Sequence, residues 1–341
     1  MSRPTEPEAR PADAAGEVDP TGTAGRDAAL VRRRGRDRAE RGFTLLTSAA
    51  GALILAVLAA VAAFLLIEAW PALSATPEEL SAISWLPEDG SLARYVVPLV
   101  FGTLLGAVLA LLLAVPVSIG IALFISHYAP RRIAGALGYV VDLLAAIPSV
   151  IYGLWGGLWL APRIQPVWDW LSQHLGFIPV FEGPAADPAR VMMTVGVVLA
   201  VMILPIITAV SREVFLQTPR LHEEAALALG ATRWEMIRMA VLPFGRSGVI
   251  SAAMLGLGRA LGETMAVLMI LSPGLTTTVA LLQAGRHQTI AANIALQFPE
   301  AGPLGVSALI ATGLALFVIT LLVNMAARWV VARRAAFSGA N

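Results

Sequence analysis

The chain has 341 residues, of which 57% are hydrophobic and only 14% are charged, and its mean hydropathy is +0.75. A soluble domain would be closer to half apolar and a quarter charged, so we expect an integral membrane protein. The net charge of +1 provides no basic field that would suggest nucleic acid, and the absence of cysteine excludes disulfides and cysteine-ligated metal.

The first 42 residues form a polar extension. Residues 1–29 hold almost no large apolar side chains, so they cannot bury enough surface to offset the entropy of ordering. Residues 30–42 carry six arginines beside the apolar run that starts at Phe43. That run is too long and begins too deep for a cleavable signal peptide. We expect residues 1–42 to be disordered and interpret the arginines as a topology anchor rather than a binding arm.

Six apolar stretches are each near or above the ~20 residues that cross a bilayer as a helix. They lie at about 43–67, 95–125, 133–160, 190–211, 248–271 and 303–327. We therefore expect an all-α, polytopic integral membrane protein with six transmembrane helices and neither cofactor nor metal.

Arginine placement predicts the orientation of these helices. With the N-terminus inside, the inner segments hold most of the arginines, including six in 30–42 and five in 212–247. The outer segments hold only Arg94, Arg163, Arg190 and Arg286. We therefore place both termini and the loop 212–247 on the cytoplasmic side.

The loop 212–247 has a pattern of its own. Residues 224–229 are strong helix formers, Gly230 interrupts them in what we expect to be a close-packed turn, and residues 231–241 can form a second helix. We expect Pro243 to stop that helix. Two short helices at an angle would make a compact knob able to fill a groove in another protein.

This loop resembles the EAA loop of permease subunits of ATP-driven importers, although Ala240 stands where the family pattern has Ile. The resemblance implies that the loop docks on a separate, ATP-hydrolysing subunit. An ordinary helical connector between spans is the alternative. The residues that carry the pattern are Glu224, Ala225, Ala226, Gly230, Leu242 and Pro243.

Charged residues inside apolar spans are costly and usually functional. Arg259 lies near the middle of the fifth span, and Glu263 follows one helical turn later, so a continuous helix would project both from one face. Asp142 lies in the third span. We interpret these residues as a polar part of an anion path, because a guanidinium donates two parallel hydrogen bonds to an oxyanion. An ion-pair network that holds helices together is the alternative.

Two further motifs narrow the resemblance. Residues 258–267, GRALGETMAV, resemble the fifth-span motif of phosphate importer permeases, and residues 146–156, AIPSVIYGLWG, resemble the third-span motif of the PstC-type subunit. The family's transport-critical Arg and Glu fall on Arg259 and Glu263. From the same two motifs we add Thr264 and Ser149 to the candidate pathway residues.

The resemblance covers about 43–332 and implies a type I ABC importer permease fold in the bacterial cytoplasmic membrane. The first helix and its outer loop would occupy 43–94, the permease core 95–328 and a cytoplasmic tail 329–341. The implied partners are a PstA-type sister permease, two copies of a cytoplasmic ATPase, an extracytoplasmic phosphate-binding protein, phosphate and membrane lipids, with no nucleic acid.

An enzymatic function is not expected. The chain has no lysine and therefore no P-loop, and no histidine lies on a predicted span to serve as a base for Ser149. Two other transport functions stay open. A permease for sulfate or molybdate would share these features, whereas an ATP-independent channel or secondary transporter would not explain the knob in 212–247.

Overall fold

The computed structural model describes the backbone of residues 21–335 and the side chains of residues 43–329. The predictions for residues 1–20 and 336–341 lie outside this range. All regular elements in the described part of the chain are helical. The chain divides into two units, Met1–Val61 and Ala62–Asn341.

The first unit holds most of α1 (Thr21–Ser74), a helix of 54 residues. Residues 21–42 are helical in the structure, which differs from the disorder expected for them. These residues include seven Arg and four Ala, which are strong helix formers. They also continue the apolar helix that follows, so the helix extends without a new nucleation step.

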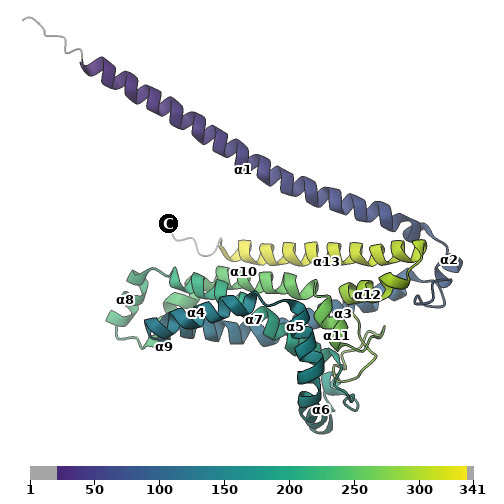
Figure 1. The fold of residues 1–341 in the computed structure, drawn as a ribbon. Helices are drawn as coiled ribbons and strands as arrows, with labels where there is room; N and C mark the ends of the chain where they lie inside the picture. Colours follow the sequence, from purple (N-terminus) through teal and green to yellow (C-terminus); the bar gives the residue numbers. More distant parts are fainter. Residues whose placement is uncertain (1–20, 336–341) are drawn as a thin grey trace, which may run out of the picture. The chain divides into compact units, whose positions relative to one another are not determined.

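The core of the second unit is built on α3 (Leu92–Leu123), α7 (Met192–Leu216), α10 (Leu242–Leu261) and α13 (Pro303–Ala335), which run alongside one another in Figure 1. Small residues allow α3 and α7 to approach closely. Ala107, Ala110 and Ala114 are buried, and a side chain added at Gly196 would collide with Leu109. The main apolar cluster of the protein lies between these helices.

The third predicted span, 133–160, is not a single straight helix. Helix α4 (Arg131–Ala145) ends before Pro148, and α5 (Ser149–Leu154) begins after it and continues through the π-helical η2 (Trp155–Leu160) into α6 (Ala161–Leu175). The two helical stretches meet at 88°. Pro148 lacks an N–H and disfavours a helical conformation at the preceding residue, which explains the break.

The fifth predicted span, 248–271, is also broken. Helix α10 ends at Leu261, and α11 (Met265–Ile270) begins three residues later. In the described residues, five helices are long and apolar enough to cross a membrane, and the bent pair on either side of Pro148 would make six.

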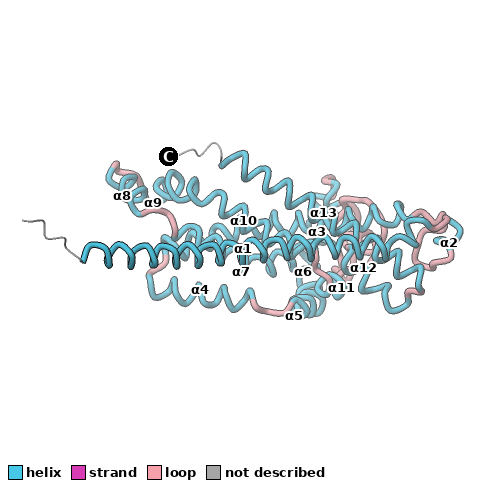
Figure 2. The backbone as a smooth tube through the Cα atoms, turned by 90° about the horizontal axis from the view of Figure 1, so that it is seen from above, coloured by secondary structure: helices cyan, strands magenta, loops and turns pink. Residues whose placement is uncertain are grey.

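Short elements occupy the two ends of the bundle, with α8 (Arg220–Ala228) and α9 (Arg233–Met236) at one end and α2 (Pro77–Ser81) and α12 (Ile290–Gln297) at the other (Figures 1 and 2). The remaining elements are η1 (Phe124–Tyr128), η3 (Pro179–Phe181), η4 (Ile237–Val241) and η5 (Phe298–Glu300).

Candidate functional site

The predicted knob in 212–247 is present as α8 and α9. Gly230 separates the two helices with a φ of +85°, a conformation that L-residues rarely adopt. No atom lies within 4 Å of a Cβ built on Gly230, so the turn is open rather than close-packed as expected. Thr232 and Glu235 then form a capping box that starts α9.

Pro243 does not stop the second helix of the knob, because residues 233–261 run as one helical stretch. Just before the proline, η4 widens the helix, and the N–H of Leu242 bonds to the carbonyl of Ile237, five residues back. The wider turn makes room for the proline ring and accommodates its missing N–H. Where we expected the helix to end, its hydrogen-bond pattern widens for one turn, and the helix continues from the knob into α10.

The outer face of the knob is exposed and partly apolar. Glu224 and Ala225 are exposed, whereas Ala226 packs on the apolar cluster that includes Phe215 and Ile237. Leu242 also packs on this cluster. Sequence reasoning missed the large apolar side chains of this face, although apolar residues inside a polar loop were a visible signal. They are Leu221, Leu227, Leu229 and Trp234, exposed at 76%, 45%, 90% and 56%.

Helices α5 and α11 lie side by side and run parallel. A Cβ added at Gly153 would lie 2.9 Å from Ala266 Cα, and one at Gly157 would lie 3.1 Å from the carbonyl oxygen of Met269. Residue numbers rise together along this contact. Gly153 lies four residues after the start of α5 and Ala266 one residue after the start of α11, so the two N-terminal ends are offset by about one helical turn. Each end follows a helix break and presents backbone N–H groups, which carry partial positive charge.

Arg259 and Glu263 do not share one helix face, because α10 ends between them. Glu263 is 8% exposed, and its Oε1 accepts a hydrogen bond of 3.0 Å from the N–H of Ala266 in the first turn of α11. Arg259 is half-buried and interacts electrostatically with Tyr152 of α5. In the described residues no ion pair joins Arg259 to Glu263.

The pathway candidates therefore divide into two groups. Ser149 begins α5, and Thr264, whose hydroxyl donates to the carbonyl of Gly262 at 3.3 Å, directly precedes α11. Both belong to the region where the two helix breaks meet. Asp142 instead faces α7, where its Oδ2 lies 4.0 Å from Nη2 of Arg212.

The Arg212 side chain ties α4 to α7. Its Nη2 donates to Glu213 at 2.8 Å, and its guanidinium covers Gly138, where an added side chain would have to displace it. The partner of Asp142 was not readable from the sequence, because Arg212 was assigned to the loop after the fourth span.

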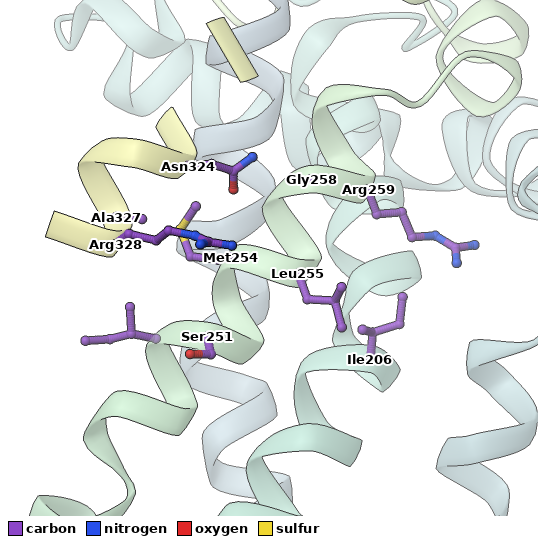
Figure 3. A pocket seen from close by; sticks show the side chains of 10 residues that line it. Ile206, Ser251, Met254, Leu255, Gly258, Arg259, Asn324, Ala327 and Arg328 are labelled. Carbon is purple, nitrogen blue, oxygen red and sulfur yellow. The ribbon is translucent and has the colours of Figure 1, made fainter. Parts of the chain in front are cut away.

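A cavity of about 780 Å³ opens between α10 and α13 (Figure 3). Arg259 contributes to its lining, and Asn324 and Arg328 of α13 line it as well. Figure 3 shows Arg259 pointing away from Arg328, so the two guanidinium groups do not converge on one point. Sequence reasoning used Arg328 only as a topology signal.

At the opposite end of the bundle from the knob, the segment 271–289 is held by buried polar contacts. His287 is 1% exposed and stacks on Phe101, and its Nε2 lies 2.7 Å from the carbonyl oxygen of Thr278. Burial lowers the pKa of His287 below its usual value of 6.5. The next helix, α12, is anchored by a bond of 2.6 Å from Asn293 Nδ2 to the Tyr95 hydroxyl.

Residues 114–336 match the family described as "Binding-protein-dependent transport system inner membrane component". The chain is 50% identical over 297 residues to "Phosphate transport system permease protein PstC 2" of Mycobacterium tuberculosis, covering 85% of this chain and 91% of that protein. It is 39% identical over 323 residues to "Phosphate transport system permease protein PstC" of Mesorhizobium japonicum, covering 90% and 97%.

Among solved structures, a bacterial ABC transporter involved in the import of the acidic polysaccharide alginate aligns with a TM-score of 0.51. The sequence identity is 19%, and the alignment covers 71% of this chain and 79% of that chain. This likeness supports the fold alone.

Proposed function

The chain belongs to the binding-protein-dependent transport system inner membrane components and, within them, to the PstC phosphate transport permeases, and we propose that it forms part of the membrane path of an ATP-driven phosphate importer. It is a multi-pass membrane protein and a transport subunit rather than an enzyme. The observation that carries the proposal is the 50% identity to a PstC protein over 85% of the chain.

The knob is the proposed docking element for a cytoplasmic ATPase. Its exposed face combines Glu224 with large apolar side chains, which is the composition of a surface that another protein covers. The knob also lies at the same end of the bundle as the C-terminal end of α13 (Figure 1). That placement agrees with the predicted cytoplasmic location of both the loop and the C-terminus.

The meeting point of the two helix breaks is the proposed place where the anion passes. Discontinuous membrane helices often direct their N-terminal ends at anionic substrates. Here two such ends lie within about one helical turn of each other, and Arg259 adds a guanidinium without a carboxylate partner among the described residues. Arg259 would contact the oxyanion directly, and Ser149 and Thr264 would lie beside it.

Glu263 has a different proposed role. Its carboxylate caps α11, and negative charge at a helix N-terminus is stabilising. Glu263 would therefore keep α11 in place beside α5 rather than contact the anion. In the alternative role, the second carboxylate oxygen of Glu263 accepts a hydrogen bond from protonated phosphate. The Glu263→Gln variant below tests this alternative.

The remaining partners follow from the family. We infer a PstA-type sister permease, two copies of the ATPase and an extracytoplasmic phosphate-binding protein, in a bacterial cytoplasmic membrane with both termini inside. Arginine distribution and the position of the knob support this orientation.

The test is uptake of labelled phosphate into vesicles that contain the complex, with arsenate, sulfate and molybdate as competitors. We expect uptake that requires ATP and the ATPase subunit, and competition by arsenate but not by sulfate or molybdate. Uptake without the ATPase would favour a channel or secondary transporter. Stronger competition by sulfate or molybdate than by arsenate would contradict phosphate as the substrate.

A further inference from the structure

A partly buried histidine connects the knob to the end of α3. His127 lies on η1, which continues α3 directly, and Glu223 lies on α8. His127 Nε2 lies 3.5 Å from Glu223 Oε1, and the two side chains are only 9% and 24% exposed. The contact joins residues that are almost one hundred positions apart in the chain.

The neighbouring Ser126 gives His127 a second polar contact. The Ser126 hydroxyl donates to the carbonyl of Ala122 at 2.8 Å, and its oxygen lies 2.7 Å from His127 Nδ1. Ser126 and Glu223 therefore contact different ring nitrogens of His127, Nδ1 and Nε2.

Few other contacts hold α8 to the bundle. No residue of α8 is fully buried, and Ala226 is its contribution to the apolar cluster beneath it. That cluster also contains Ala122 and Leu123 of α3. A polar contact to η1 and an apolar contact to the cluster that includes the last residues of α3 therefore connect α8 to the end of this helix.

We propose that the chain of polar contacts Ser126–His127–Glu223 positions the coupling helix α8 on η1 at the end of α3, so that movement of the knob is passed directly to a helix of the transport core. The role in coupling rests on the proposed function. The chain of contacts itself does not, and the two are measured separately.

The link between α8 and α3 is measured by trypsin cleavage after Arg220, the first residue of α8, and after Arg233, the first residue of α9, in the purified full-length chain. His127→Ala and Glu223→Ala should each accelerate this cleavage at least about five-fold, because a contact with a charged carboxylate contributes more than one between neutral groups. The double variant should cleave no faster than either single variant, because both substitutions remove the same contact.

Glu223→Gln supplies a rescue. A glutamine amide can donate to Nε2 of a neutral imidazole, so cleavage should stay near the wild-type rate. The matched control is His222→Gln, an exposed histidine on the same helix, which should cleave like the wild type. Wild-type cleavage in both alanine variants, or additive acceleration in the double variant, would overturn the proposal.

The consequence for transport is measured as phosphate taken up per ATP hydrolysed by the complete complex in vesicles. His127→Ala and Glu223→Ala should bind the ATPase normally, because the exposed face of α8 is unchanged, but should lower this ratio at least about five-fold. Normal ratios together with faster cleavage would overturn the coupling role of the link. If faster cleavage is found but the wild-type complex shows no ATP-dependent phosphate uptake, the proposed function fails while the link between α8 and α3 stands.

Discussion

Replacement of Gly230 by valine tests whether the shape of the knob controls docking. The free-energy cost of this substitution comes from the backbone, because Gly230 has a φ of +85°. A steric clash does not contribute, because no atom lies within 4 Å of the added Cβ. A β-branched residue in the left-handed region costs about 1–3 kcal/mol. Since each 1.4 kcal/mol corresponds to about a ten-fold change in an equilibrium constant, the population of docking-competent knob should fall at least several-fold.

The assay is co-purification of the ATPase with the membrane complex, followed by phosphate uptake. Gly230→Val should insert normally but retain little ATPase and little uptake, whereas Gly230→Asn should be mild because asparagine tolerates this conformation. Gly120→Val is the matched control, since its added Cβ also meets open space but its φ lies outside the left-handed region. Wild-type ATPase binding and uptake in Gly230→Val would refute the reasoning.

Four further outcomes are expected. Glu263→Gln should leave the relative competition by sulfate unchanged, because the amide oxygen still caps α11; stronger sulfate competition would instead indicate direct contact with the anion. Arg259→Lys should lower phosphate uptake at least about ten-fold because a point charge cannot replace the guanidinium fork, and full transport by Arg259→Ala would rule out a pathway role. Deletion of residues 1–29 should leave uptake near the wild-type level, and loss of transport would reveal a function there. The lowered pKa of His287 favours its neutral form, so the stability that this residue contributes should be complete above about pH 6.5 and should decline as the pH falls below that value. The thermal unfolding midpoint should show the same pH dependence, and His287→Phe should weaken it.

Local composition was sufficient to identify an integral membrane protein and the order of its membrane helices and of the loop that forms the knob. Apolar runs identified where the membrane helices lie, because the bilayer demands a minimum length of apolar helix, although the ends of the first, third and fifth spans and the start of the fifth differ from the predicted ones. The two helices of the knob and the turn at Gly230 were also readable, since helix propensity and glycine conformation are local properties. The family followed from motifs that are contiguous in the chain.

Tertiary structure decided where spans break and which distant residues meet. The third and fifth spans were each predicted as one stretch, but only the packing of α5 beside α11 shows that both are broken and that the two breaks lie within about one helical turn of each other. Glu263 was expected beside Arg259 because helical spacing was assumed to continue past Leu261. The contact between His127 and Glu223 joins residues far apart in the chain, and such contacts depend on how whole helices pack, which the periodicity of a single segment does not determine.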